Sequence, residues 1–178
     1  MTILINGSIN AGKTTVAKAL CELLPRTAHV EVDSLHDFIG WMDLEESIPL
    51  NLKNAAAVGR NFLEYGLNVV ISYPLNPPDY QYLAAALDGF PLACFTLSPP
   101  LEVARRNRGA RVLSDWERER IAFHYATGIA SPAFGAIIDN AAQTPRQTAA
   151  EIASRLGVAP DGGCQLTDAR NRLPTSDS

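Results

Sequence analysis

The chain has 178 residues, of which 47% are hydrophobic, and its formal net charge at pH 7 is −4. This length fits one domain, and the apolar content is sufficient for a hydrophobic core. The acidic balance disfavours nucleic acid as the main partner, because proteins that bind it present a basic face. We expect no membrane partner either, since the sequence has no apolar run of about 18 residues. No secretory signal is visible, so a cytoplasmic location is the default expectation.

Three cysteines, Cys21, Cys94 and Cys164, lie far apart in the sequence and form no Cys-x-x-Cys pair. This pattern is typical of reduced thiols and argues against a disulfide framework or a metal cluster. Cys21 and Cys94 lie in apolar patterns, and we expect both to be small core residues.

Residues 7–14 read Gly-Ser-Ile-Asn-Ala-Gly-Lys-Thr. This is the spacing of a glycine-rich loop that wraps a phosphate with its backbone N–H groups. The glycines are needed because the loop visits backbone angles that a Cβ would obstruct. The lysine of such a loop reaches the β and γ phosphates, and the hydroxyl of the following Ser or Thr holds Mg²⁺.

The segments on either side have the structure that a phosphate loop requires. Their apolar patterns predict a strand over residues 2–6 and a helix over residues 15–24. A glycine turn that binds nothing is the alternative, but the complete motif with the correct flanking elements argues against it. We therefore predict a site for ATP and Mg²⁺. Its predicted ATP-binding residues are Gly7, Ser8, Ile9, Asn10, Ala11, Gly12, Lys13, Thr14 and Thr15, with Thr14 as the metal ligand.

Four more apolar strands alternate with helices along the rest of the chain. Such alternation predicts an α/β fold of three layers, with a five-stranded parallel sheet and right-handed crossovers. We expect the domain to span residues 1–156 and residues 157–178 to form a poorly ordered tail. The strands are predicted over residues 29–32, 68–73, 92–97 and 135–139, the helices over residues 34–42, 51–65, 79–87, 101–106, 114–126 and 144–156, and a polar loop over residues 43–49.

Two of these helices have well-marked starts. Ser114 is followed three residues later by Glu117, which is the pattern of a capping box. Thr144 precedes Pro145, so that a capping hydroxyl and a proline stand in their favoured positions.

Asp33 follows the second predicted strand, and ligands of open α/β sheets gather at the carboxyl ends of strands. Its carboxylate, or the hydroxyl of Ser34, could cap the next helix. It could also act on a bound substrate, and the two uses are compatible. The sequence therefore leaves both roles open for Asp33.

Four short segments in this order resemble the small P-loop kinases of metabolites. They are the phosphate loop, Val-Asp-Ser-Leu at residues 32–35, Arg-Gly-Ala-Arg-Val at residues 108–112, and the turn from Asp139 to Pro145. Within that group the chain is most similar to chloramphenicol phosphotransferase, with shikimate kinase and gluconate kinase as more distant relatives. The similarity spans residues 1–156, and only the phosphate loop is highly specific. It implies the P-loop NTPase fold, with a small lid at about residues 105–120 after the fourth strand.

The resemblance implies roles for two residues of the phosphate loop and for Asp33. Lys13 bridges the transferred phosphate, and Thr14 binds Mg²⁺. Asp33 takes the place of the aspartate that accepts the proton of the substrate hydroxyl or orients it. Because an unperturbed aspartate is a weak base at neutral pH, we expect orientation to be its larger contribution.

The resemblance also implies that arginines of the lid reach over the phosphates. Arg108 and Arg111 match that pattern, and Gly109 gives the segment a place to bend. Arg105 or Arg106 would lie against the adenine. For two further arginines, at positions 118 and 120, we favour solvated charges on a helix face.

One position departs from the family. Relatives often carry an acidic residue at the end of the third strand, where it holds Mg²⁺ through water, and this chain has Ser72. Metal binding would then rest on Thr14, Asp33 and the nucleotide. Candidates to line the acceptor pocket are His36, Phe38, Trp41, Tyr73 and Tyr125, although a residue such as His36 is more often on the surface of a helix.

The favoured function is an ATP-dependent kinase that acts on a hydroxyl of a small molecule, with an antibiotic or a sugar-like metabolite as candidate acceptors. A nucleotide-binding regulator that hydrolyses ATP slowly is the alternative, and Ser72 is its best support. A nucleoside or polynucleotide kinase shares the fold, but the acidic balance disfavours the polymer version.

Overall fold

The computed structural model describes residues 1–107 and 112–158. Arg108, Gly109 and Arg111 of the predicted lid lie outside the described residues, as does residue 159 onward, which includes Cys164 and most of the predicted tail. Of the other two cysteines, Cys94 is buried and Cys21 is partly buried.

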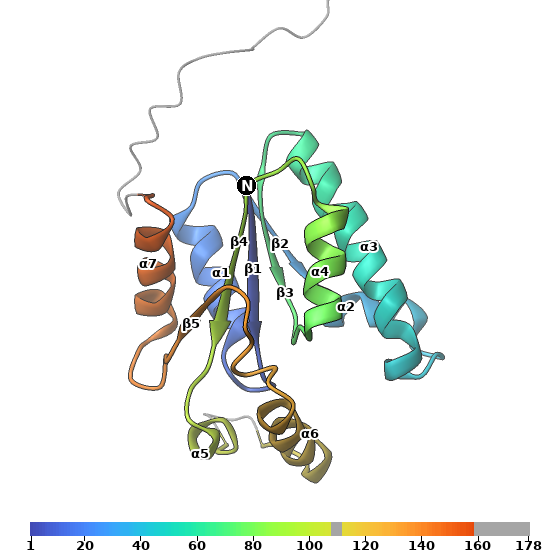
Figure 1. The fold of residues 1–178 in the computed structure, drawn as a ribbon, viewed down its shortest axis with the longest axis vertical. Helices are drawn as coiled ribbons and strands as arrows, with labels where there is room; N and C mark the ends of the chain where they lie inside the picture. The colour runs from blue at the N-terminus through green and yellow to red at the C-terminus, as the bar shows by residue number, and fades with distance from the viewer. Residues whose placement is uncertain (108–111, 159–178) are drawn as a thin grey trace, which may run out of the picture.

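Five parallel strands form one sheet in the order β2-β3-β1-β4-β5, which confirms the predicted α/β architecture (Figure 1). Their bounds are β1 Thr2–Gly7, β2 Thr27–Glu31, β3 Asn68–Ser72, β4 Leu92–Leu97 and β5 Ala136–Ile138. The central strand β1 is buried along its whole length. Consecutive side chains point to opposite faces of a strand, so Ile3 and Ile5 enter one core cluster and Leu4 enters the other.

Helices cover both faces of this sheet (Figure 1). On one face α1 (Lys13–Leu23) packs against α7 (Pro145–Arg155), and on the other lie α3 (Leu44–Glu64) and α4 (Pro77–Ala86). The short helices α2 (Val32–Leu35) and η1 (His36–Ile39) follow β2. The helices α5 (Leu101–Ala104) and α6 (Asp115–Ala126) lie beyond the carboxyl ends of the strands, where Figure 1 shows them below the sheet.

The predicted starts of α6 and α7 are confirmed. Ser114 and Glu117 form a capping box, in which each side chain accepts a hydrogen bond from the other residue's backbone N–H. Thr144 caps α7 in the same way with Gln147, and Pro145 occupies the first turn.

The predicted loop over residues 43–49 is wrong, because α3 already begins at Leu44. Pro49 suggested a break, yet it lies early in the helix, where its missing N–H costs one backbone hydrogen bond. Buried Ser47 and Leu52 anchor the helix on either side of Pro49. The extra turns of α3 extend it toward the carboxyl edge of the sheet.

The predicted helix over residues 34–42 is also different in the structure. The chain turns into α2 at Val32 and tightens into the 3-10 helix η1 at His36. Asp33 therefore lies inside α2, whose N-cap position is Glu31, and no side chain caps that helix end. The predicted capping role of Asp33 is wrong.

Asn6, at the carboxyl end of β1, fixes the segments that leave the sheet beside it. Its Nδ2 donates to the Oγ1 of Thr96, at 3.0 Å, and to the carbonyl oxygen of Ile129, at 3.1 Å. Its Oδ1 accepts from the backbone N–H of Leu75 at 2.7 Å. Because these bonds are buried, losing one would leave an unpaired polar group, which costs about 1–3 kcal/mol.

Across residues 1–107 and 112–158, no helix combines the length and the apolar character that crossing a membrane requires.

Candidate active site

The predicted phosphate loop connects β1 to α1, and its backbone takes conformations that favour glycine. Gly7 has φ 143°, and a Cβ there would stand 2.6 Å from the carbonyl oxygen of Leu97 in β4. Gly12 has φ 94°, and Asn10 adopts the left-handed region with φ 62°. Close packing therefore requires glycine at position 7, and backbone geometry favours it at position 12.

The loop delivers the N-terminus of α1 without any side chain that covers it. Gly12 is the N-cap and provides no side-chain hydrogen bond, and the first turn contains no acidic residue. The first backbone N–H groups of a helix have no partners within it, and the helix dipole makes this end positive. Such an end is suited to binding a phosphate.

Hydrogen bonds with three other segments hold the loop in place. Asn10 Nδ2 donates to the carbonyl oxygens of Ala104 and Arg106, at 2.8 and 2.9 Å. Asn140, after β5, donates from Nδ2 to the carbonyl oxygen of Ala11 at 3.0 Å. On the remaining side, the Oγ of Ser8 lies 3.2 Å from Nδ1 of a buried histidine in α6, His124. The loop is thus preorganised before any ligand arrives.

Lys13 lies at the start of α1, and its Nζ donates to the carbonyl oxygen of Ser8 at 3.0 Å. Lys13 also lines a cavity of about 800 Å³ in front of the loop. Thr14 and Thr15 line the same cavity, as do Ile9, Asn10 and Gly12, whereas Gly7, Ser8 and Ala11 lie buried beneath it.

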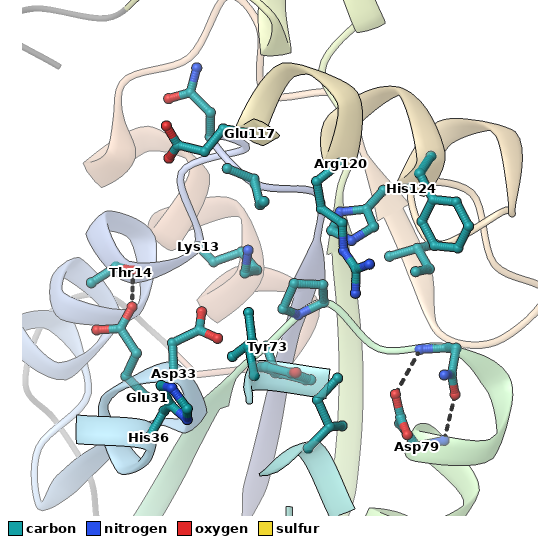
Figure 2. Close-up of a pocket in the computed structure, with 18 of the residues that line it drawn as sticks. Lys13, Thr14, Glu31, Asp33, His36, Tyr73, Asp79, Glu117, Arg120 and His124 are labelled. Atoms are coloured by element: carbon teal, nitrogen blue, oxygen red, sulfur yellow. Dashed lines mark hydrogen bonds between the residues drawn. The ribbon is translucent and has the colours of Figure 1, made fainter. Parts of the chain in front are cut away.

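Thr14 donates a hydrogen bond from its hydroxyl to the carboxylate of Glu31, at the end of β2 (Figure 2). Sequence reasoning missed Glu31, because it sought an acidic residue at the end of the third strand. Ser72 stands there, next to Glu31 in the sheet register, and its Oγ lies 2.8 Å from Nε2 of His29. The usable signal was the Glu-x-Asp spacing, which places Glu31 at the end of β2 and Asp33 two residues later.

Asp33 reaches the cavity from α2, opposite Lys13 (Figure 2). Although Asp33 is exposed as a whole residue, neighbouring groups partly desolvate its carboxyl, and this desolvation raises the carboxyl pKa. The positive charge of Lys13 opposes the rise and lowers the pKa, Glu31 raises it, and the charge of His36 lowers it. Since the net pKa lies above the ordinary value, Asp33 is a better base than an unperturbed aspartate.

The cavity extends from the phosphate loop between α3 and α6. Of the predicted lining residues, His36 and Tyr73 face it, whereas Phe38, Trp41 and Tyr125 are not among the residues of its wall. Phe38 and Trp41 are more than 80% exposed elsewhere. Residues of α3, α4 and α6 complete the wall, among them Leu44, Glu45, Ile48, Asn76, Asp79, Trp116, Arg120 and Phe123.

Arg120 lies in this wall, contrary to the prediction of a solvated charge. Its Nη1 donates to Glu45 Oε1 at 3.0 Å, and its guanidinium carbon lies 5.2 Å from the centre of the Phe123 ring. The ion pair joins α6 to α3 across the cavity. Arg118 is not part of the wall. It donates to the carbonyl oxygen of Arg105, at 2.6 Å, and to the side chain of Asn107, in exposed hydrogen bonds that agree with the predicted position on a helix face.

Arg105 ends α5, is exposed, and is not part of the cavity wall. The two arginines predicted to reach the phosphates, Arg108 and Arg111, lie outside the described residues. Among the predicted site residues, the structure therefore brings together the phosphate loop and Asp33.

His124 should make stability depend on pH. Desolvation, with smaller effects of Lys13 and Arg120, lowers its pKa from 6.5 to about 4, so the folded protein holds a neutral imidazole. A lowered pKa contributes stability above pH 6.5 that is lost as the pH falls toward 4. We expect the free energy of unfolding to lose about 2 kcal/mol through this residue by about pH 5.

Denaturant unfolding of the parent and of His124→Gln, at about pH 7.5 and pH 5, measures this loss. Glutamine does not titrate, so the variant should lack this part of the decline. Other groups with shifted pKa, such as His29 and Asp33, are common to both proteins and cancel in the comparison. Equal declines in the two proteins would contradict the assignment.

No protein-family model matches the sequence, and no curated protein matches it. Solved structures do match. A sugar kinase from Janibacter sp. HTCC2649 superposes with a TM-score of 0.68 at 18% identity, over 89% of this chain and 95% of that one. The tunicamycin resistance protein of Deinococcus radiodurans gives 0.64 at 22% identity, over 89% and 96%. Shikimate kinase from Acinetobacter baumannii in complex with shikimate gives 0.60 at 17% identity, over 87% and 92%. The chain therefore has the three-layer α/β fold of the P-loop kinases.

Proposed function

We propose that this protein is an ATP-dependent phosphotransferase that acts on a hydroxyl group of a small molecule. The observation that carries the proposal is one cavity with two chemically distinct ends. The phosphate loop, with Lys13 and Thr14, forms one end, and Asp33 faces it from α2. An anion site and a basic carboxylate in one cavity suit the transfer of a phosphoryl group to a hydroxyl.

The residues of this site fit a nucleoside triphosphate with Mg²⁺. The open N-terminus of α1 and the Lys13 ammonium suit the phosphates, and the Thr14 hydroxyl and Glu31 carboxylate are the oxygen donors that Mg²⁺ prefers. Within the described residues no group of three or more His, Cys, Asp and Glu side chains could hold a metal alone. Bound ATP supplies the phosphoryl group, and Mg²⁺ neutralises charge on its phosphate oxygens.

Asp33 would orient the acceptor hydroxyl and accept its proton. Its raised pKa makes the carboxylate a stronger base, and the nearby charge of Lys13 opposes this rise in pKa. Phosphoryl transfer depends mainly on positioning and charge neutralisation, so one well-placed carboxylate is sufficient for this role.

Arginines complete the proposed site. Arg120 provides a cation in the wall of the cavity, and a guanidinium can bind two phosphate or carboxylate oxygens at once. Arg108 and Arg111 remain proposed phosphate contacts of a closing lid, and Arg105 a proposed residue on the adenine side.

The wall contributed by α6 also bears on the acceptor. Trp116 and Phe123 both line the cavity, and they are 54% and 49% exposed. Leu44 and Ile48 of α3 line it as well. Large apolar groups that face water favour an apolar ligand, at about 25 cal/mol per Å² covered. This supports an acceptor that carries an apolar part, and of the two candidate classes it favours an antibiotic over a purely polar sugar.

The rival reading, a slow ATP hydrolase with an impaired metal site, rested on Ser72. The contact between Thr14 and Glu31 removes that argument, because a carboxylate already lies beside the predicted metal ligand.

Glu31 should support Mg²⁺ binding. Residues that hold a metal ligand typically change metal affinity or activity 10- to 100-fold when mutated. We expect Glu31→Gln to raise the Mg²⁺ concentration for half-maximal ADP release by at least about tenfold. Ser72→Ala is the matched control, since Ser72 bonds to His29 and should not change this value. The assignment fails if the two variants behave alike.

Asp33 should be needed for transfer to the acceptor. ADP release is measured against a panel of hydroxylated small molecules, with Asp33→Asn beside the parent. We expect at least one acceptor to raise turnover, and the substitution to reduce that gain by about 10²- to 10⁴-fold. Asp37→Asn is the control, because this exposed carboxylate is not part of the cavity wall. If no acceptor raises turnover, and if Asp33→Asn leaves turnover unchanged, the slow ATP hydrolase is favoured instead.

A further inference from the structure

His36 lies on the same side of the chain as Asp33. The backbone N–H of His36 donates to the carbonyl oxygen of Asp33, three residues earlier. Residues three apart in such a tight turn project from the same face. Both side chains line the cavity, and Figure 2 shows them near each other.

A buried pair of polar residues in α3 holds the inner edge of the His36 ring. Its Nδ1 lies 3.0 Å from the Oγ of Ser47, which is fully buried. Asn51, one turn further along α3 and also buried, donates from Nδ2 to the same oxygen at 3.2 Å. The Ser47 Oγ lies 2.7 Å from the carbonyl oxygen of Leu44.

These contacts determine which nitrogen of His36 carries the proton. Two oxygens 2.7 Å apart need a hydrogen between them, and the Leu44 carbonyl has none to give. The Ser47 hydroxyl must therefore donate its one hydrogen bond to the carbonyl oxygen of Leu44. The lone pairs of its oxygen can only accept hydrogen bonds. His36 consequently donates from Nδ1. In the neutral ring Nε2 is then unprotonated, and it can accept a hydrogen bond.

Nε2 lies on the side of the ring away from the contact with Ser47, and His36 is one of the residues that line the cavity. Within the described residues, no hydrogen bond engages this nitrogen or the Asp33 carboxylate. The other acidic groups of the wall already have partners: Glu31 bonds to Thr14, Glu45 to Arg120, Asp79 to the backbone of Asn76, and Glu117 to the backbone of Ser114. Asp33 and His36 therefore present two adjacent hydrogen-bond acceptors.

We propose that Asp33 and Nε2 of His36 form a paired acceptor site, which binds two neighbouring donors of one small molecule. A vicinal diol or a 1,2-amino alcohol has this chemistry. One hydroxyl, on Asp33, is the group that receives the phosphoryl group, and its neighbour donates to His36. This assignment rests on the proposed phosphotransferase function and narrows the class of its substrate.

NMR distinguishes the two tautomers of the His36 ring directly. Long-range ¹H–¹⁵N spectra at about pH 8.5, where imidazoles are neutral, distinguish the Nδ1–H and Nε2–H forms. His36→Gln assigns the signal among the three histidines. We expect the Nδ1–H form in the parent protein and a shift toward the Nε2–H form in Ser47→Ala. An Nε2–H form in the parent would overturn it.

Matched acceptors test the substrate class. Each cyclic cis-1,2-diol in an ADP-release panel is paired with its mono-O-methyl ether, which lacks one donor. For the parent we expect the KM for a diol to be at least about tenfold lower than the KM for its ether. A tenfold change corresponds to about 1.4 kcal/mol, which is the contribution of one hydrogen bond. In His36→Asn, whose shorter amide can still reach Ser47 but not the cavity, this preference should disappear. In His36→Gln, whose longer amide reaches further toward the position of Nε2, part of it should return.

The outcomes separate the two levels of the proposal. Stimulation by diols and ethers alike, or an unchanged preference in His36→Asn, would overturn the paired site and leave the phosphotransferase in place. Stimulation by no acceptor would overturn both. The variant Asp37→Asn, at an exposed neighbouring position, controls for general effects of altering η1. Its preference for diols should match that of the parent protein.

Discussion

The site depends on the close approach of two backbones at the end of the central strands. Gly7 of β1 lies so near the carbonyl of Leu97 in β4 that a Cβ would stand 2.6 Å from that oxygen. This contact allows the chain to turn sharply out of the sheet and to enter α1 with its first N–H groups uncovered. Asn10 then bonds the loop to the carbonyl of Ala104, and Asn140 and His124 bond to it from two other segments. A phosphate site that is already formed loses little entropy when it binds, and its dipoles need no reorganisation.

The predicted elements agree with the structure where local patterns dictate the outcome. Five apolar strands, the phosphate loop and two capped helix starts follow from periodicity and from residue chemistry within a few positions. The start of α3 was missed because Pro49 is read locally as a break, whereas buried contacts at Ser47 and Leu52 hold the helix together. Tertiary packing overrides propensity in such cases.

The site was predictable only in part, for a related reason. Lys13, Thr14 and Asp33 lie next to recognisable strand ends, so their positions follow from the order of elements. Glu31 was missed because the expected acid was sought on the neighbouring strand, and strand register is not visible in a single motif. His36 was predicted as a pocket residue, but its contact with Ser47 was not. The place of Arg120 in the cavity wall was missed, because its contact with Glu45 comes from a distant segment of the chain.

The whole account requires that the loop of residues 7–14 bind the phosphates of ATP. Calorimetric titration of the protein with Mg²⁺ and ATP, beside the variant Lys13→Ala, tests this most directly. We expect a saturable heat of association for the parent and a loss of at least about tenfold in affinity for the variant, because a charge-assisted contact to phosphate is removed. An absence of binding in the parent, or equal affinity in both proteins, would contradict the account.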